Sequence, residues 1–368
     1  MSKRLILIGG GHAHMVTMVN LKKFIERGHQ VTLIGPSEHH YYSGMGPGLL
    51  SQIYSAQETR FAIRKMVEKH GGTFIRNTVT RIDPHKRLVI AQDDERYSYD
   101  LLSCNTGSYV QSPEAVRDNG TLFCAKPIER LRQARQTLIE MVVGKRVRVA
   151  VIGGGAAAVE IAGNVWRLLT RHARHGFELR LFASGSLLSR FPAKVKAAGL
   201  KSLVRRGVEV LQNCPAKAIS MDAVETDSGR TYPADVIFIA TGVKPSPIFK
   251  ASGLPVGPDG GLAVNQYLQC TAYPNIFGGG DCIYYQDSPL EKVGVYAVRQ
   301  NPILFNNLLA ALEGDTLKPF SPGGSYLLIF NMGDGTGILY KNGILLRGRL
   351  AFLIKDYIDR RFIQTYRR

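Results

Sequence analysis

The sequence predicts an α/β fold in which two parallel sheets are built from alternating strands and helices. At two places, a short apolar segment runs directly into three consecutive glycines, at 9–11 and at 153–155, and a helical segment and a further strand follow each time. The chain has 368 residues, 45% of them hydrophobic, which is enough to bury two cores of ordinary size. Because alternating strands and helices pack as a parallel sheet covered by helices, each place is expected to begin one Rossmann-like unit.

The first unit has the residue types that a dinucleotide-binding turn requires. Residues 5–8 are expected to form a buried strand, 15–27 an amphipathic helix, and 30–34 the next strand. Gly9 permits the tight turn, and Gly11 lets backbone N–H groups approach a pyrophosphate at the start of the helix. This unit is therefore predicted to hold a nucleotide.

The second unit repeats the same order of elements. Residues 147–152 and 178–182 are expected to be strands, and a helix is expected to run from the glycine loop to about residue 171. A glycine-rich loop alone is a weak signal, but two loops in the same strand and helix context predict two bound nucleotides.

Neither unit has the acidic residue that usually closes its second strand and accepts bonds from a ribose 2′-OH. The corresponding positions are Gly35, where Ser37 can substitute, and Ala183, which Ser184 follows. The choice between NADH and NADPH therefore stays open at this stage. Arg190 could contact a 2′-phosphate, but the favoured interpretation is an ordinary surface arginine.

Composition restricts the partners and the chemistry. The formal net charge of +18 suits an anionic partner, but no nucleic-acid motif accompanies it, and we expect no nucleic-acid partner. The five cysteines form no close pair, which argues against a disulfide reductase and indicates a reducing compartment. The N-terminus does not read as a signal peptide, and no apolar run is long enough to span a membrane.

Four histidines, at 12, 14, 39 and 40, lie near the first glycine loop. Their spacing fits neither a helical i, i+4 pair nor a Cys/His zinc site, so no metal site is predicted. His12 is interpreted as a cofactor contact or as packing at the start of the helix.

Three further motifs resemble a known family when they are taken with the two glycine loops. They are the segments 99–108, 235–242 and 274–281, whose sequences are YDLLSCNTGS, DVIFIATG and PNIFGGGD. The ordered set resembles two-dinucleotide-binding-domain flavoproteins of the pyridine nucleotide-disulfide oxidoreductase superfamily, above all type II NADH:quinone oxidoreductases and sulfide:quinone reductases. The resemblance implies FAD on the first loop, NAD(P)H on the second, and electron transfer to a quinone-like or other two-electron acceptor.

The resemblance also implies roles for individual residues. Asp281 matches the aspartate that bonds the FAD ribitol, Val79 the backbone contact to adenine, and Glu160 a glutamate near nicotinamide and flavin that can relay protons. The implied catalytic residues are Glu160 and Gln300. The implied FAD-binding residues are Gly9, Gly11, His12, Ala13, Ser37, Pro47, Val79, Thr106, Gly107, Gly280, Asp281 and Val295. The implied nicotinamide-binding residues are Gly153, Gly155, Ala156, Ala157, Ser184 and Gly242.

Segments 10–14, 41–48 and 294–300 resemble NADH-dehydrogenase-like proteins that are sometimes fused to selenide, water dikinase. Gly294 and Val295 stand where the quinone reductases carry Ala-Gln. Two alternatives remain open: a sulfide:quinone reductase-like enzyme, and an FAD-bound redox-sensing module that turns over poorly. Cys282, next to Asp281, is either a sulfur carrier or a small apolar filler.

The last segment of the chain predicts an attachment element. Residues 326–330 and 337–341 flank a turn-forming sequence and predict a hairpin, and a helix is expected from about 349 to 367. An apolar stripe on this helix is surrounded by arginines and lysines, which suits a membrane surface, the protein body or a second subunit. The stripe consists of Leu350, Leu353, Ile354, Tyr357 and Ile358.

The predicted organisation has four parts. Residues 1–110 and 245–320 would form the FAD-binding domain, 111–244 the NAD(P)-binding domain, and 321–368 the membrane-attachment or dimerisation element. The expected location is the cytoplasm. For residues 321–368 two roles are expected as alternatives: peripheral contact with the inner face of the cytoplasmic membrane, or formation of a homodimer.

Overall fold

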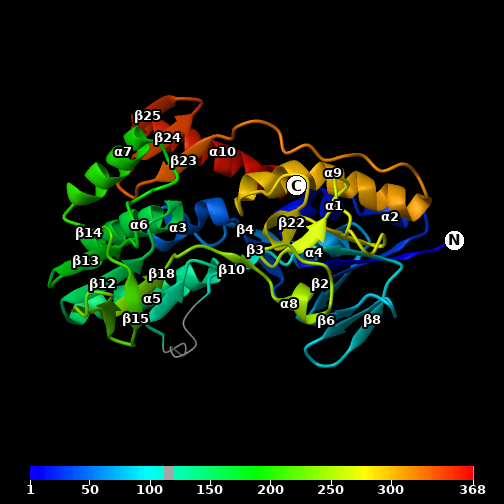
Figure 1. Ribbon diagram of the computed structural model, residues 1–368, viewed down its shortest axis with the longest axis horizontal. Helices are drawn as coiled ribbons and strands as arrows, with labels where there is room; N and C mark the ends of the chain where they lie inside the picture. The colour runs from blue at the N-terminus through cyan, green and yellow to red at the C-terminus, as the bar shows by residue number, and fades with distance from the viewer. Residues whose placement is uncertain (112–119, 368) are drawn as a thin grey trace.

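The computed structural model describes residues 1–111 and 120–367 and contains two five-stranded parallel sheets (Figure 1). The first sheet has the order β21-β9-β1-β2-β5. Its strands are β1 (Arg4–Ile8), β2 (Gln30–Gly35), β5 (Thr73–Arg76), β9 (Leu101–Cys104) and β21 (Ile276–Gly278). The central strands are almost wholly apolar and buried, as expected for a parallel sheet covered on both faces.

The expectation of one continuous helix over 15–27 is wrong. The chain instead forms η1 (His12–His14), α1 (Met15–Val19) and α2 (Lys22–Ile25). The break falls at Asn20, whose side-chain amide donates to the carbonyl of Val16 at 2.8 Å. Asparagine competes with the backbone in this way, which explains why the helix ends there.

The remaining elements of this half surround the sheet. α4 (Ile63–Lys69) contacts β5, and α9 (Gly294–Glu313) packs along η1 and α1. Four of the smaller helices are η2 (Ser43–Met45), α3 (Gly46–Leu50), α8 (Ile248–Ala251) and η3 (Gly280–Cys282). Two small sheets have two strands each: β3 (His39–Tyr41) pairs with β4 (Arg60–Ala62), and β20 (Leu262–Val264) pairs with β22 (Ile283–Tyr285). A third has three strands in the order β6 (Val79–Asp83), β7 (Leu88–Ala91) and β8 (Arg96–Ser98).

The second sheet has the order β11-β18-β12-β13-β14. Its strands are β11 (Leu122–Cys124), β12 (Val147–Ile152), β13 (Phe177–Phe182), β14 (Glu209–Leu211) and β18 (Val236–Ile239). Its helices are α5 (Glu129–Gly144), α6 (Ala156–His172) and α7 (Ala193–Val204), and a small antiparallel sheet joins β15 (Ala216–Ile219), β16 (Ala223–Thr226) and β17 (Thr231–Pro233).

The chain passes between the two halves at a short ribbon. β10 (Ser108–Tyr109) pairs antiparallel with β19 (Lys244–Pro245), so the outgoing and returning segments run side by side. The predicted boundaries at 110 and 245 lie at this ribbon, and the division into FAD-binding and NAD(P)-binding domains remains our proposal.

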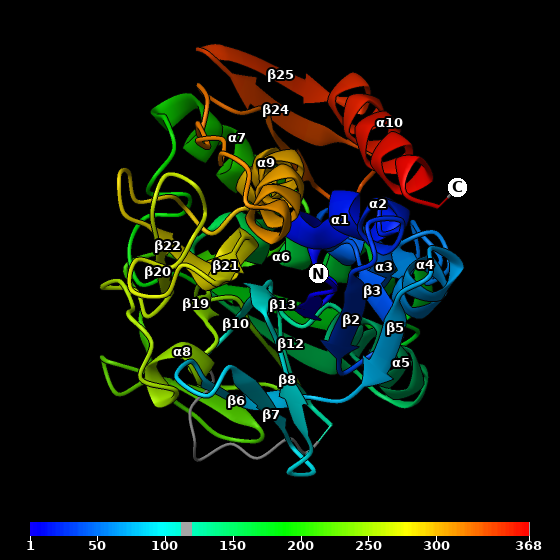
Figure 2. The same cartoon turned by 90° about the vertical axis from the view of Figure 1, so that its right-hand side faces the viewer.

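The C-terminal element is larger than predicted. β23 (Leu328–Asn331) and β24 (Gly337–Lys341) form the expected hairpin, and an unpredicted third strand, β25 (Ile344–Gly348), precedes α10 (Arg349–Thr365). This sheet lies beside α6 and α7, whereas α10 reaches across to the first half of the molecule (Figures 1 and 2).

The face of α10 that packs against the protein is not the predicted apolar stripe. Ala351, Lys355, Asp359 and Ile363 are buried, whereas Leu350, Leu353, Tyr357 and Ile358 are exposed. α10 is thus fixed to the body by a face that includes a charged pair, and most of the apolar stripe points outward. No helix among the described residues is long and apolar enough to cross a membrane.

Candidate functional site

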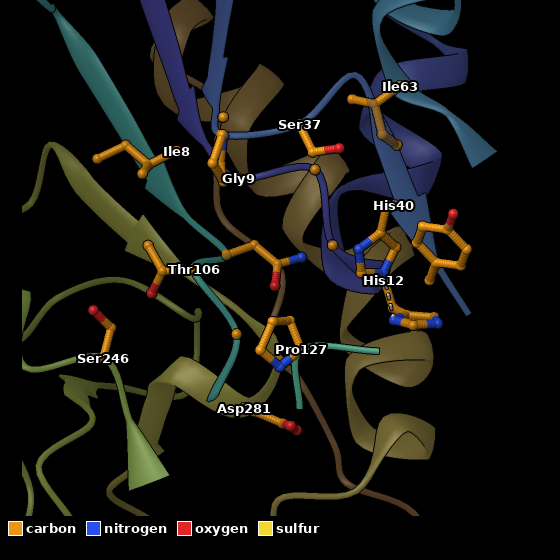
Figure 3. A pocket seen from close by; sticks show the side chains of 18 of the residues that line it. Ile8, Gly9, His12, Ser37, His40, Ile63, Thr106, Pro127, Ser246 and Asp281 are labelled. Atoms are coloured by element: carbon orange, nitrogen blue, oxygen red, sulfur yellow. Dashed lines mark hydrogen bonds between the residues drawn. The ribbon is translucent and has the colours of Figure 1, made fainter. Parts of the chain in front are cut away.

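A cavity of about 380 Å³ opens at the carboxyl ends of β1, β2 and β9 (Figure 3). Open α/β sheets bind their ligands at this edge, and the volume lies within the range of small-molecule sites. Of the predicted FAD-binding residues, nine line the cavity: Gly9, Gly11, His12, Ser37, Val79, Thr106, Gly107, Gly280 and Asp281.

The first glycine loop is shaped by its contact with Asn105. Gly9 has a φ of +82°, and a Cβ atom there would lie 2.4 Å from the carbonyl oxygen of Asn105. A Cβ atom on Gly11 or Gly280 would lie 2.8 or 2.9 Å from the side-chain oxygen of Asn105. Packing on Asn105 therefore requires glycine at these three positions. Asn105 was not among the predicted site residues, although it directly precedes the predicted Thr106.

Three buried polar atoms around this cavity have no partner among the described residues. They are Nε2 of His12, Nδ2 of Asn105 and Oγ1 of Thr106. Buried polar groups are nearly always hydrogen-bonded, so the three atoms indicate that a polar molecule completes the site. A dinucleotide with ribose, phosphate and ring acceptors fits this requirement.

Asp281 sits at one end of the cavity in an ion pair that the sequence did not reveal. Its Oδ2 accepts from Nζ of Lys126 at 2.6 Å and from Oγ of Ser108 at 2.7 Å. Burial opposes ionisation of Asp281, but the charge and hydrogen bond of Lys126 together with the hydrogen bond of Ser108 outweigh it, and the pKa of the carboxyl stays below its usual value. Asp281 is thus an anion, and Lys126 also lines the cavity.

Three predicted FAD-binding residues do not line the cavity. Ala13 is fully buried and faces Gly279, and Pro47 is buried within α3, which packs against α5 and α6. Val295 lies in the first turn of α9, but Gly294 and Ala297 line the cavity instead. Residues three apart share one face of a helix, so Val295 points away from that face.

Gln300, predicted to be catalytic, supports the loop behind the cavity. Its side chain is buried, and its Oε1 accepts from the backbone N–H of Gly280 at 2.7 Å. Gln300 does not line this cavity. It holds the backbone that precedes Asp281, which is a positioning role.

The second glycine loop lies at the carboxyl end of the second sheet. Gly153 has a φ of +140°, and a Cβ atom there would lie 2.2 Å from the carbonyl oxygen of Ala240. Among the predicted nicotinamide-binding residues, Gly155, Ala157, Ser184 and Gly242 are exposed and Ala156 is half-buried. Except for the buried Gly153, these residues are accessible to a ligand at this edge.

Ala183, at the position where an acidic residue usually stands, faces the second glycine loop. It is fully buried, and a Cβ atom on Gly154 would lie 3.1 Å from the Cβ of Ala183. Ser184 is the exposed residue at the end of β13. Ser184 therefore exposes a hydroxyl group directly after Ala183, which has no polar side chain.

Glu160 lies where α6, β23 and α10 meet. Its Oε1 accepts from the backbone N–H of Asn331 at 2.8 Å. Burial raises the pKa of Glu160 to about 7, and the nearby Lys355 partly opposes this increase. Near neutral pH the carboxyl group can therefore both hold and release a proton.

α10 contributes a buried polar cluster beside Glu160. Nζ of Lys355 donates to Asp359 and to the carbonyl of Gly44, both at 2.8 Å, and the Tyr42 hydroxyl donates to Asp359 at 3.1 Å. The sequence pattern did not predict this cluster, because Lys355 was grouped with the basic residues that surround the apolar stripe. The charges on Lys355 and Asp359 at helical spacing were the available signal.

The cysteines near the cavity are enclosed. Cys282 and Cys104 are fully buried, and the Cys282 thiol donates to the carbonyls of Gly279 and Cys104. Burial raises the pKa of both thiols. Because the thiolate is the reactive form, this environment suits a filler role for Cys282.

Comparisons with known proteins agree with this arrangement. The family model described as pyridine nucleotide-disulphide oxidoreductase matches residues 3–301. The chain is 27% identical to ferroptosis suppressor protein 1 of Taeniopygia guttata over 97% of the chain and 93% of the relative. It is 23% identical to a type II NADH:quinone oxidoreductase of Staphylococcus saprophyticus over 98% of the chain and 95% of the relative.

The fold is similar to that of a solved sulfide:quinone oxidoreductase from Aquifex aeolicus. The TM-score is 0.80 and the identity 20%, and the match covers 99% of this chain and 91% of the other.

Proposed function

The chain belongs to the pyridine nucleotide-disulphide oxidoreductase family, and on that premise we propose that it passes two electrons from NAD(P)H through FAD to a quinone-like acceptor. The observation that carries the proposal is the pair of glycine loops at the carboxyl ends of two parallel sheets. The first borders a cavity with three unpaired polar atoms, and the second is exposed to solvent. One chain thus offers a site for a tightly held cofactor and a site for an exchanging one.

FAD supplies two-electron chemistry when it is bound, and the residues around the first cavity would hold it. The backbone of the loop 9–11 can approach a phosphate because no side chains project from it. Thr106 and Asn105 offer unpaired donors, and the Asp281 carboxylate can accept from hydroxyl groups. We assign Val79, which also lines the cavity, to the adenine end.

Glu160 is the residue that we assign to proton handling. Reduction of a quinone to a quinol consumes two electrons and two protons, so a proton must be held near the acceptor. The Glu160 carboxyl, held by Asn331 and with a pKa of about 7, is suited to this task at neutral pH.

A quinone-like acceptor is supported by the names of relatives such as the type II NADH:quinone oxidoreductase, and a sulfide:quinone oxidoreductase of Dictyostelium discoideum is also among the relatives. Against sulfide as the electron donor stands the burial of Cys282, next to Asp281, and of Cys104: both thiols are fully buried.

The outward face of α10 supports peripheral contact with a membrane. Leu353 and Tyr357 are about 60% exposed, and Arg349 and Arg361 beside them are also exposed. An exposed apolar face flanked by arginines suits an anionic lipid surface, which would place the protein on the inner face of the cytoplasmic membrane. A homodimer formed through the same face is the competing proposal.

The deciding experiment is an anaerobic stopped-flow titration of the purified flavoprotein. Mixing with NADH or NADPH should bleach the flavin absorbance in one turnover, and a short-chain quinone should restore it. Sulfide should not bleach it. Tight FAD without bleaching by either coenzyme would instead support a redox-sensing module, and bleaching by sulfide would support the sulfide-oxidising alternative.

A further inference from the structure

Two histidines of the first glycine loop differ in how their ring nitrogens are used. Nδ1 of His14 lies 2.7 Å from the carbonyl oxygen of Gly9, and its Nε2 lies 2.8 Å from Oγ of Ser103. A carbonyl oxygen can only accept, so Nδ1 carries the proton and Nε2 accepts from the hydroxyl. Both nitrogens of His14 are therefore used inside the protein, and its ring braces the loop.

His12, two residues earlier, has a partner for only one nitrogen. Its Nδ1 lies 3.3 Å from Nε2 of His40, and the two rings meet edge to face at one end of the cavity (Figure 3). Its Nε2 is buried and unpaired among the described residues, and the residue is 8% exposed. Both histidines line the cavity, so the molecule that fills it is the candidate for the missing partner.

Aromatic rings hold the histidine pair in place. Phe362 of α10 stacks on His12 with ring centroids 5.7 Å apart, and Tyr42 lies 5.2 Å from His12. Phe61 stacks on His40 at 6.4 Å. Rings packed in this way restrict rotation, so the orientation of the unpaired nitrogen is preorganised.

The pair is neutral at physiological pH. Burial lowers the pKa of His12 to about 4, and the opposing effect of Asp281 is partly cancelled by Lys126. Burial, His12 and Lys126 hold the pKa of His40 well below its usual value. Each neutral ring carries one N–H. If the N–H between the two rings belongs to His40, the proton of His12 is on Nε2 and this atom donates. If it belongs to Nδ1 of His12, then Nε2 of His12 accepts.

We propose that His40 is a positioning residue that donates its Nε2–H to Nδ1 of His12, and that His12 in turn donates its own Nε2–H to an acceptor atom of bound FAD. This assignment of donor and acceptor follows from the ligand, because FAD presents mainly acceptors: phosphate oxygens, ring nitrogens and ring carbonyls. The inference rests on the proposed function, since it requires FAD in this cavity.

The first test compares two amide substitutions of His12. Glutamine places an amide nitrogen near the position of Nε2, whereas asparagine places one near Nδ1. We expect His12→Gln to bind FAD within about threefold of the wild-type affinity, and His12→Asn to bind it about tenfold more weakly, since one hydrogen bond is lost. The Kd is measured from quenching of flavin fluorescence by the apoprotein, and His175→Gln, at an exposed histidine, is the matched control.

The same assay examines His40. His40→Gln keeps a donor near Nε2 and should retain FAD affinity, whereas His40→Phe keeps the ring volume without the donor and should lose it. Equal affinities for the glutamine and asparagine variants of His12, or full affinity in His40→Phe, would overturn the inference.

A second measurement needs no substitution. In the FAD-bound wild-type protein labelled with ¹⁵N-histidine, Nε2 of His12 should show a one-bond splitting from its own proton, and Nδ1 should not. A proton on Nδ1 instead would refute the assigned tautomer. If the wild-type protein bound no FAD, the proposed function would fail as well, whereas FAD binding without these signatures would reject the inference alone.

Discussion

Asn105 and Lys126 show how single residues determine the first cavity. Asn105 lies against Gly9, Gly11 and Gly280, so one side chain sets the path of two loops. Lys126 neutralises Asp281 and holds it at one end of the cavity. Neither residue belongs to a glycine motif, and both act through contacts between segments that are distant in the sequence.

Glu160 yields a prediction about stability. The pKa of Glu160 is raised from 4.5 to about 7 by burial, so its charged form is disfavoured in the folded protein. The wild-type protein should therefore lose stability as the pH rises from about 4.5 through about 7, and Glu160→Gln should not show this loss. Relative to wild type, the variant should gain about 1–3 kcal/mol in the free energy of unfolding between pH 5 and pH 8, measured in urea. A pH-independent difference would contradict the assigned burial.

Ser184 yields a prediction about the coenzyme. With no carboxylate at the end of β13, the kcat/KM values for NADH and NADPH should differ by no more than about two decades. Ser184→Glu should shift the ratio toward NADH by roughly tenfold, because a carboxylate repels a 2′-phosphate. Steady-state kinetics with both coenzymes measure the ratio, and an unchanged ratio would place the ribose elsewhere.

At the scale of secondary-structure elements, the C-terminal sheet packs directly against α6 in the second half of the molecule. A Cβ atom on Gly163 of α6 would lie 2.4 Å from the carbonyl oxygen of Met332, and one on Gly333 would lie 2.1 Å from the carbonyl oxygen of Gly163. Two backbones thus meet without side chains between them. This contact brings Asn331 to Glu160.

Gly163→Ala tests this contact. Alanine normally stabilises a helix interior by up to about 1 kcal/mol relative to glycine, but here the added methyl group must displace β23. We expect the free energy of unfolding to fall by about 1–3 kcal/mol in urea denaturation. The matched control is Gly144→Ala at the end of α5, where an added Cβ meets no atom within 4 Å, and its effect should be neutral or stabilising. Similar effects at both sites would refute the close contact.

The outward face of α10 yields a prediction about lipid binding. The double variant Leu353→Ser, Tyr357→Ser should reduce co-sedimentation with anionic vesicles about tenfold or more, because it removes exposed apolar surface without touching the buried face. The matched control replaces Val204 and Met221, which are similarly exposed on other elements, and should bind as the wild type does. High salt should weaken binding of every form. Unchanged vesicle binding by the double variant, with a change in dimerisation, would favour a second subunit at this face.

At the scale of the whole molecule, the C-terminal element joins the two halves. β23 packs on α6, whereas α10 contacts the first half through Lys355 with Gly44 and through Arg360 with Glu58 at 2.8 Å. The C-terminal element is therefore packed against both halves of the protein. Any contact of its outer face with a lipid surface or a second subunit comes in addition.

Truncation after Gly348 tests this bridge. Removal of α10 should lower the melting temperature by about 5 °C or more and reduce the FAD retained on purification, because Tyr42 and His12 lose their partners Asp359 and Phe362. Differential scanning fluorimetry and the ratio of flavin to protein absorbance are the measurements. An unchanged melting temperature with full FAD content would show that α10 serves only as an attachment.

The sequence by itself determined the parts that depend on local order. Strand, glycine loop and helix follow one another within about 25 residues at both sites, and the backbone there is governed by neighbours in the chain. The α/β class, the two loops and nine of the residues that line the cavity followed from these patterns and from the family resemblance.

Only the tertiary structure decided which distant side chains meet. Lys126, His40 and Lys355 come from three separate segments, and their contacts with Asp281, with His12 and with the carbonyl of Gly44 depend on sheet order and on the path of the C-terminal element. Residue spacing says which side of a helix or strand a residue faces, but not what packs against that side. For this reason the sequence left open whether α10 packs on a membrane, on the protein body or on a second subunit, and only the structure shows that its inner face completes the core beside Glu160.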